Sequence, residues 1–100
     1  MRPTIAFFLF LSYFQTFAQT KVSGVVKDEF GYEISYVTIL FEDKSDFSNS
    51  DVDGKYSISC EDCTSDTIIF KSLGYKPYRT TYTKGIDQII NPVLKEDIIE

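Results

Sequence analysis

The sequence predicts an all-β fold, a single sandwich of seven short antiparallel strands preceded by a cleaved leader. Turn-forming residues recur every ~8–12 positions, a spacing typical of β-sandwiches. Between these turns, apolar and polar residues alternate with the period of half-buried strands. No window has a sustained helical apolar period, so we expect no helix in the mature domain.

Residues 1–18 have the three regions of a secretory signal peptide. Arg2 provides the positive charge, residues 5–14 form an apolar run, and Ala18 precedes the expected cleavage site at Gln19. The run is about half as long as the ~20 residues that a membrane-spanning helix needs. No cysteine lies at the junction, so a lipid anchor is not expected. We predict an exported chain, periplasmic or secreted, that does not span a membrane after cleavage.

Removal of the leader from the 100-residue chain leaves enough residues for one domain and no more. We expect the sandwich to occupy residues 19–94 and an acidic tail to occupy residues 95–100. The formal net charge is −5, and the chain has no run of Lys or Arg. This balance argues against nucleic acids and anionic membrane surfaces as partners.

Three strands are expected before the Asp-Gly turn. Residues 20–27 alternate loosely around three valines and end at a turn containing Gly31. Residues 35–42 are apolar on both faces, which predicts a central strand that is covered on both sides or flanked by long side chains. Residues 47–50 follow a charged turn and predict a short edge strand.

The fourth strand follows Asp53-Gly54, a strong hairpin signal because glycine adopts positive φ at no steric cost. Tyr56, Ile58 and Cys60 then share one face of this strand, and the residues between them share the other.

Residues 66–76 contain the fifth strand and the turn that follows it. We expect Tyr56, Phe70 and Tyr75 to build the core. Gly74 is expected to allow a bulge or a close approach of two backbones beside Tyr75.

The sixth and seventh strands complete the predicted sandwich. Tyr78, Thr80 and Tyr82 alternate with polar residues in the sixth. Residues 86–94 supply the seventh, which Pro92 confines to a sheet edge or a strand end.

An ordered set of short segments resembles the carboxypeptidase-regulatory-like domain over nearly the whole mature chain. The segments are Val22-Ser23-Gly24-Val25-Val26-Lys27-Asp28, Gly31, Ile34, Val37-Thr38-Ile39, Ser50-Asp51-Val52-Asp53-Gly54-Lys55-Tyr56-Ser57-Ile58 and Leu73-Gly74-Tyr75-Lys76. The resemblance implies a seven-stranded sandwich of the transthyretin type. Such domains often form the N-terminal extension of TonB-dependent, SusC-like outer-membrane receptors. Others are secreted alone or follow the catalytic domain of metallocarboxypeptidases, where they have no catalytic role.

The end of the chain departs from the pattern of receptors. There the last strand is followed by an acidic segment and a valine-rich box that engages TonB. Residues 94–100 resemble the acidic segment, and no box follows within the sequence. Two interpretations stay open: a free-standing secreted domain, and a fragment of a longer receptor, which we favour slightly.

Cys60 and Cys63 are the only cysteines and have C-x-x-C spacing. In an exported protein a local disulfide is the default interpretation. Free thiols and a redox or metal-binding role are the alternatives. Redox catalysis is disfavoured because Glu61 and Asp62 would raise the thiol pKa and no helix follows. A disulfide here would close a short loop and stabilise the fold by about 2 kcal/mol.

The predictions for metals, cofactors and catalysis are negative. The turn at residues 51–54 has the wrong spacing for a calcium loop, since its glycine directly follows the second Asp and the twelfth position is Asp62. The chain has no histidine and no second cysteine pair, so the four ligands of a zinc site and the commonest general base are missing. Carboxylates such as Glu42 and Asp43 are strand neighbours that point to opposite faces. We predict no enzymatic activity.

Tyr78, Arg79 and Tyr82 lie together on a late strand. If exposed, the two tyrosines would form an amphipathic contact patch for a protein or a sugar ring. Packing inside the sandwich is the alternative and receives more weight.

The sequence therefore predicts a non-catalytic accessory module at the periplasmic face of the outer membrane or outside the cell. The first hypothesis is the N-terminal extension of a TonB-dependent receptor involved in nutrient import, with envelope proteins or the rest of the receptor as partners. The second is a free-standing secreted domain that binds a protein or a glycan. A thiol–disulfide exchange protein is the third.

Overall fold

The computed structural model describes residues 19–97 and is built from strands and turns. Its nine strands are β1 (Thr20–Val25), β2 (Lys27–Asp28), β3 (Thr38–Phe41), β4 (Phe47–Asn49), β5 (Lys55–Cys60), β6 (Thr67–Lys71), β7 (Tyr78–Thr81), β8 (Asp87–Ile89) and β9 (Val93–Leu94). Residues 19–97 include no helix with the length and hydropathy needed to cross a membrane. The predicted leader and its cleavage site before Gln19 involve residues 1–18, which lie outside the described part.

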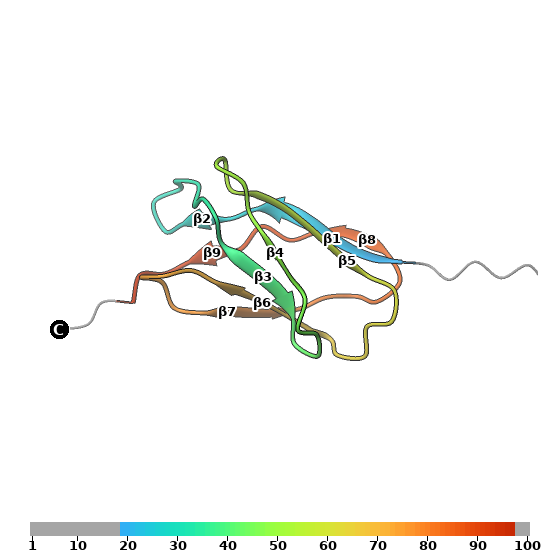
Figure 1. Ribbon diagram of the computed structural model, residues 1–100. Helices are drawn as coiled ribbons and strands as arrows, with labels where there is room; N and C mark the ends of the chain where they lie inside the picture. Colours follow the sequence, from blue (N-terminus) through green and yellow to red (C-terminus); the bar gives the residue numbers. More distant parts are fainter. Residues whose placement is uncertain (1–18, 98–100) are drawn as a thin grey trace, which may run out of the picture.

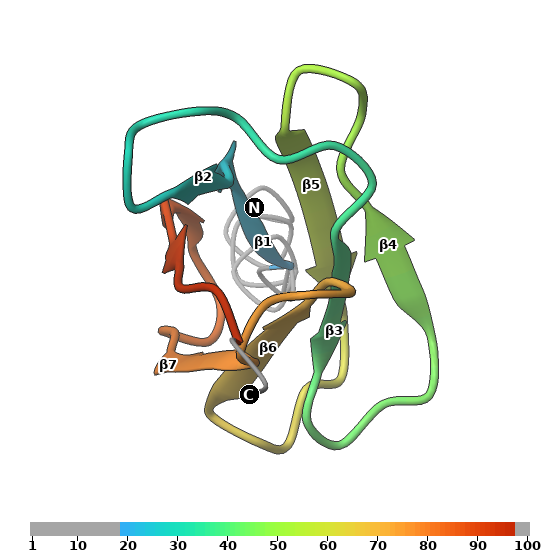
Figure 2. The ribbon, with the colours of Figure 1, turned by 90° about the vertical axis from the view of Figure 1, so that its left-hand side faces the viewer.

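Two main sheets pack face to face, as predicted for a sandwich (Figures 1 and 2). One sheet has the strand order β5-β1-β8, and the other has the order β4-β3-β6-β7. Strands β2 and β9 form a third, two-stranded pair. The count of nine exceeds the predicted seven because the first and last predicted strands are each broken in two.

The core lies between the two main sheets, and side chains of β1, β3, β5, β6, β7 and β9 contribute to it. Tyr56 and Phe70, both predicted core residues, meet edge to face with ring centroids 5.2 Å apart. Tyr75 is half-buried against this cluster. The Tyr56 hydroxyl donates a 2.6 Å hydrogen bond to the carbonyl oxygen of Ile90, and burial raises the pKa of Tyr56. The buried members of the cluster are Val22, Val26, Ile34, Val37, Ile39, Phe41, Tyr56, Ile68, Phe70, Tyr82 and Leu94.

The sheets are not purely antiparallel, which corrects the prediction. Strand β8 pairs parallel with β1, and β9 pairs parallel with β2. The predicted single strand at residues 86–94 is interrupted before Pro92, which has no backbone N–H to continue the pairing. Its carbonyl oxygen still accepts a 3.1 Å hydrogen bond from the backbone N–H of Lys27. The first and last parts of the domain therefore run side by side.

Strand β9 and the residues after it connect β2 with the opposite sheet. Tyr75 and Glu96 form an isolated antiparallel bridge, and the N–H of Lys76 donates to the carbonyl oxygen of Lys95 at 2.8 Å. Figure 2 shows β9, in red, between β2 and β7 on one side of the sandwich. The backbone N–H of Asp97 also donates to Gly74. Residues 95–97 are thus part of the domain and not a separate tail, which corrects the predicted boundary at residue 94.

Gly74 has a different role from the predicted one. Its φ of +88° is in the left-handed region that glycine adopts without strain. No atom lies within 4 Å of the position that a Cβ would take, so this is an open turn and not a close approach. The close approach occurs at Gly24, where an added Cβ would overlap the carbonyl oxygen of Ile90.

Strand β3 begins three residues later than the predicted strand at residues 35–42. Tyr36 has a φ of +60°, which breaks the extended backbone before the strand can start. The buried hydroxyl of Ser50 accepts from the N–H of Val37 at 2.8 Å and donates to the carbonyl oxygen of Ile34 at 3.1 Å. This side chain supplies hydrogen bonds that a sheet partner would otherwise provide.

Within β3 the prediction of a central strand, apolar on both faces, is confirmed. Leu40 faces outward between Phe47 of β4 and Ile69 of β6. Ile69 is 4% exposed although it lies outside the main core cluster. Its next neighbour in the sheet is Arg79 of β7, which pairs with Glu42. Long side chains therefore border the outer face beside Ile69, as expected.

Two turns at one end of the sandwich have the same hydrogen-bond pattern. In each, an Asp carboxylate accepts two backbone N–H groups at 2.9 Å, from the second and fourth residues after it: Asp28 in one turn and Asp51 in the other. The glycine three residues after each Asp has a φ near +80° to +90° and donates to the Asp carbonyl oxygen: Gly31 and Gly54. The Asp-Gly turn leads from β4 in one sheet to β5 in the other, so it crosses between sheets instead of closing a two-stranded hairpin.

Candidate functional site

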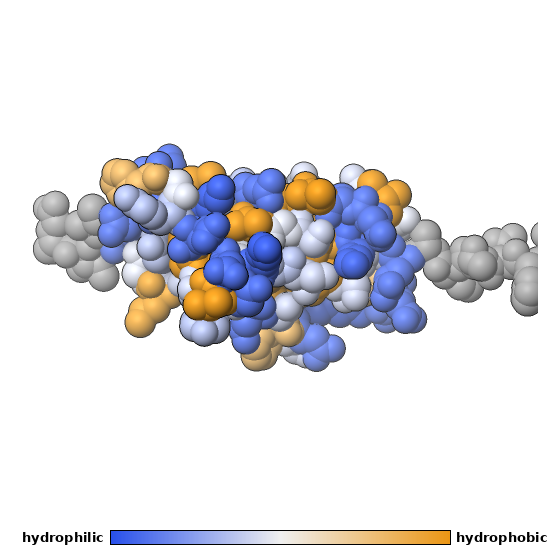
Figure 3. Space-filling model, turned by 90° about the horizontal axis from the view of Figure 1, so that it is seen from above, coloured by the Kyte–Doolittle hydropathy of each residue, from blue (hydrophilic) through white to orange (hydrophobic). Residues whose placement is uncertain are grey.

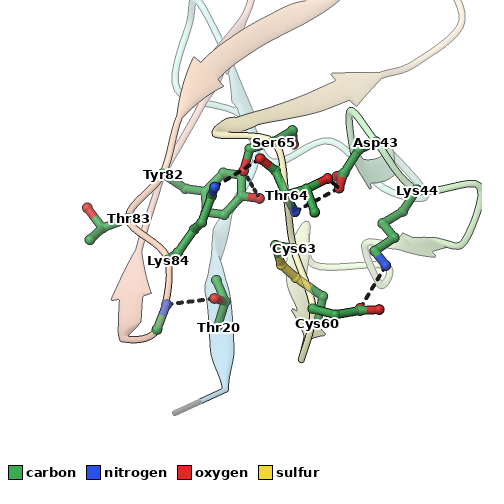
Figure 4. The surroundings of a disulfide bond; sticks show 12 residues. Thr20, Asp43, Lys44, Cys60, Cys63, Thr64, Ser65, Tyr82, Thr83 and Lys84 are labelled. Atoms are coloured by element: carbon green, nitrogen blue, oxygen red, sulfur yellow. Dashed lines mark hydrogen bonds and ion pairs between the residues drawn. A yellow bond between two sulfur atoms is a disulfide. The ribbon is translucent and has the colours of Figure 1, made fainter. Parts of the chain in front are cut away.

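The surroundings of Cys60 and Cys63 form a polar, hydrogen-bonded corner of the domain (Figure 4). The two residues are joined by a disulfide at the end of β5, with their Cα atoms 5.9 Å apart. Both side chains are half-buried and pack against the core cluster. The bridge closes a loop of two residues, Glu61 and Asp62, on the surface.

Asp43, in the turn after β3, binds the chain just beyond the disulfide. Its Oδ2 accepts a 2.8 Å hydrogen bond from the N–H of Thr64 and a second from the Thr64 hydroxyl. These hydrogen bonds stabilise the carboxylate and hold the pKa of Asp43 well below its usual value of 3.8. The Asp43 carboxylate thus links the turn after β3 to the segment that follows the disulfide.

Lys44 makes a second link to the same loop. Its Nζ donates to Oδ1 of Asp62 at 2.7 Å, inside the ring closed by the disulfide. The hydrogen bond raises the pKa of Lys44 and lowers the pKa of Asp62. Because Asp62 is exposed, water weakens this ion pair and its contribution to stability is small.

The other side of the loop is held from the second sheet and the segment before β8. The Tyr82 hydroxyl donates to the carbonyl oxygen of Ser65 at 2.7 Å, and Lys84 Nζ donates to that of Thr64 at 2.9 Å. The N–H of Gly85 donates to the hydroxyl of Thr20 at 2.7 Å. Figure 4 shows these contacts on the opposite side of the loop from Asp43 and Lys44. The disulfide loop is therefore anchored on both flanks.

An open hollow of about 470 Å³ lies beside the disulfide, between the edges of the two sheets at β4 and β5. Its lining combines two phenylalanines and an isoleucine with both signs of charge: Phe41, Lys44, Asp46, Phe47, Ile58, Ser59, Cys60, Glu61 and Asp62. The volume would suit a small ligand. Lys44 and Asp62 bind each other, so these two charged groups are not directed at a ligand in the hollow.

The predicted contact patch of Tyr78, Arg79 and Tyr82 does not form as an exposed surface. Tyr82 is 6% exposed, and its ring packs on Phe41 at 4.9 Å between centroids. Tyr78 is half-buried, with its ring edge to face on Phe70 at 5.9 Å. Arg79 points to the opposite face of the strand, where Nη1 lies 3.1 Å from Glu42. Tyr82 instead packs inside the sandwich, which is the alternative that the sequence favoured.

The described residues offer little for metal or acid–base chemistry. Residues 19–97 contain no group of three or more Cys, Asp or Glu side chains close enough to hold a metal ion. The Asp51 carboxylate, in the turn considered for calcium, is engaged with the N–H groups of Asp53 and Lys55. The arrangement can hold loops in place.

Sequence reasoning found the cysteines of this corner but not the residues that hold it. Asp43 and Thr64 are far apart in the chain, as are Lys44 and Asp62, and no periodicity links them. The charged residues of the two turns, Asp43 and Lys44 in one and Asp62 in the other, were the available signal, and they do not specify a pairing.

The fold and this corner define a small all-β sandwich module with a disulfide-closed loop. The family model of the CarboxypepD_reg-like domain matches residues 22–100. The chain belongs to this family, which confirms the resemblance noted in the sequence.

Solved structures with the same fold have very different sequences. A chain of the Coh3ScaB–XDoc_M1ScaA complex, an interface mutant of a type II cohesin–X-dockerin complex from Acetivibrio cellulolyticus, gives a TM-score of 0.63 at 13% identity, over 77% of this chain and 58% of that one. The corresponding M2 mutant complex gives 0.57 at 11% identity, over 75% and 56%. Chlorocatechol 1,2-dioxygenase from Pseudomonas putida gives 0.53 at 11% identity, over 84% and 63%.

These similarities concern the fold alone. The chain spans less than two thirds of the length of each of these structures. The comparison with curated proteins gives no match.

Proposed function

We propose that this domain is a non-catalytic accessory module of an exported protein, at the N-terminus of a TonB-dependent outer-membrane receptor. Membership of the CarboxypepD_reg-like family supports a module of this kind. In this role the domain lies at the periplasmic face of the outer membrane and contributes contacts, while nutrient import is carried out by the rest of the receptor.

The observation that carries the proposal is the position of the two ends of the domain. Strand β1 starts at one end of the sandwich, and the segment after β9 lies at the opposite end (Figure 1). The backbone of residues 95–97 is bound to the segment before β7. This geometry suits a domain at the free N-terminus that cleavage of the leader would leave, with any following segment attached at the opposite end.

A free-standing secreted module that binds a protein or a glycan is the second candidate. It is favoured by aromatic side chains exposed in the connection between β2 and β3: Phe30 at 73%, Tyr32 at 72% and Tyr36 at 68%. Exposed aromatic rings are common contacts for proteins and sugars. Thiol–disulfide exchange has the least support, because the disulfide loop is anchored by Asp43 and Lys84 on its two flanks.

An immunoblot of fractionated cell envelopes tests the proposal. An antibody against the domain should detect an outer-membrane protein many times larger than 11.5 kDa, the mass of the 100-residue chain. A single band at or below that mass, in the periplasmic or extracellular fraction, would reject the receptor and favour the second candidate.

A further inference from the structure

Three lysines that are distant in sequence come together around β9. Lys27 lies beside Val93 in the parallel β2–β9 pair. On the other side of β9, the bridge between Tyr75 and Glu96 places Lys76 opposite Lys95. Residues directly opposite or beside each other in a sheet project from the same face. We call this surface, made by Lys27, Lys76, Lys95 and Val93, the lysine strip.

Two hollows lie along the lysine strip and share Val93. One, of about 190 Å³, is lined by Val25, Lys27, Asn91, Pro92 and Val93. The other, of about 220 Å³, is lined by Lys76, Pro77, Tyr78, Val93 and Lys95. Each is small for a cofactor and suits a single apolar side chain. Neither lining includes an Asp or a Glu, although the chain carries a net charge of −5.

The charges of the strip are not balanced within the described residues. The two ion pairs of residues 19–97 use Lys44 and Arg79, so none of the three strip lysines has a carboxylate within 4.0 Å there. The acid beside Lys27 in register is Glu33, on the side away from β9. Like charges placed directly opposite each other in a sheet are destabilising, which applies to Lys76 and Lys95. An anionic partner would relieve this repulsion.

We propose that the lysine strip is a docking site for an extended acidic peptide segment with apolar side chains at alternate positions. Alternate side chains of an extended peptide are about 6.6 Å apart and point the same way, which suits two hollows on either side of Val93. The carboxylates between them point away from the hollows, toward the ends of the long lysine side chains that project from the same surface. The inference concerns a partner and is independent of the receptor context proposed above.

Charge selects a short peptide over other anions. A long polyanion or an anionic membrane would meet the negative charge of the whole domain, which repels it. A short peptide senses only the charges within about one Debye length, roughly 8 Å at physiological ionic strength. The apolar lining also favours a ligand with apolar groups over an inorganic anion.

The test is fluorescence anisotropy with the exported chain, purified after cleavage of its leader. The probe is a dye-labelled peptide, Glu-Leu-Glu-Leu-Glu, with blocked termini. We expect a Kd on the order of 100 μM for so shallow a site, weakening as salt is added. The double variant Lys76→Gln, Lys95→Gln should bind about tenfold more weakly. The control is Lys71→Gln, which removes one positive charge on the outer face of β6, outside the lysine strip. It should bind the peptide with the wild-type Kd.

Comparison probes separate this proposal from simple charge attraction. Weak binding of Gln-Leu-Gln-Leu-Gln and of inorganic polyphosphate supports it, because both carboxylates and apolar groups are then required. Equal binding of either probe would overturn it. So would no peptide binding at 1 mM, or equal losses in the double variant and in Lys71→Gln. The urea midpoints should show that the double variant is folded and no less stable than the wild type, since it removes a lysine–lysine repulsion.

Discussion

The side-chain oxygen of Asn91 accepts a 2.9 Å hydrogen bond from the backbone N–H of Val25. This contact lies where β1 gives way to β2 and β8 gives way to β9. On either side of it, backbone pairs continue the contact: Ile90 N–H to Ser23 and Lys27 N–H to Pro92. A side chain thus substitutes for the hydrogen bond that the broken backbone does not supply.

Asn91→Ala should lower the free energy of unfolding by about 1 kcal/mol, because the N–H of Val25 loses its partner. Asn91→Asp should recover most of the loss, since a carboxylate oxygen can accept the same bond. Urea unfolding measures both. The control is Asn49→Ala, whose side chain has only a 3.4 Å contact with the hydroxyl of Thr38. An equal loss in Asn49→Ala would argue against the role given to Asn91.

Gly24→Ala should destabilise the fold by about 1–3 kcal/mol, the usual cost of overpacking. An added Cβ would overlap the carbonyl oxygen of Ile90 and lie 2.7 Å from Oδ1 of Asn91, so β1 and the segment after β8 would have to separate. Ser23→Ala is the neighbouring control and should change stability by less than about 0.5 kcal/mol. Equal urea midpoints for the two variants would contradict the close approach.

The sequence predicted the all-β class and the alternation of β5 because these follow from local patterns. Tyr56, Ile58 and Cys60 needed only the period of two. The parallel pairing of β1 with β8 could not be predicted in this way, since it depends on Gly24 allowing Ile90 to come close. The late start of β3 likewise depends on Ser50, whose hydroxyl accepts a hydrogen bond from the N–H of Val37 and has no sequence signature.

Replacing both Cys60 and Cys63 by serine should lower stability by about 2 kcal/mol and leave the fold intact, because the disulfide closes a very short loop. Far-ultraviolet circular dichroism and urea unfolding, with and without reductant, test this. A thiol reagent should detect no free thiol in the oxidised protein. Loss of the fold on reduction would contradict a bridge that only pins one loop.

The stability of the domain should fall as pH drops below the usual pKa of an Asp, about 3.9. Hydrogen bonds from Thr64 lower the pKa of Asp43 in the folded state, so the folded protein holds its proton less tightly than the unfolded chain does. The stabilisation is therefore complete above the unfolded pKa and is lost as pH falls through the folded one. Asp43→Asn removes this titration and should flatten the fall.

Urea midpoints at pH 7 and pH 2.5 measure the effect. Asp46→Asn is the matched control, because its side chain is exposed and the described residues give it no hydrogen bond. This control should follow the wild-type fall. If Asp43→Asn and the wild type lose stability in parallel, Asp43 does not contribute as described.

Tyr82→Phe should lower stability by about 1 kcal/mol, since the hydroxyl donates to the carbonyl oxygen of Ser65. Tyr75→Phe is the control, as its hydroxyl has no hydrogen bond within the described residues, and it should be close to neutral. Thermal or urea unfolding distinguishes them. A neutral Tyr82→Phe would reopen the question of a contact role for this tyrosine.

The candidate site was predictable only in part. Cys60 and Cys63 could be paired from their spacing, whereas Asp43, Lys44 and Lys84 reach the loop from separate segments. The lysine strip was hidden for the same reason: Lys27, Lys76 and Lys95 are isolated in the sequence, and only the β9 pairings bring them together. Charge patterns along a chain indicate clusters that are local and miss those formed by long-range pairing.

The most direct test of the proposed function is to sequence the gene beyond the codon for Glu100. The account predicts that the reading frame continues into a valine-rich box and then a long region with the alternation of barrel strands. A stop codon directly after Glu100 would contradict the receptor assignment and leave a small secreted module as the function to pursue.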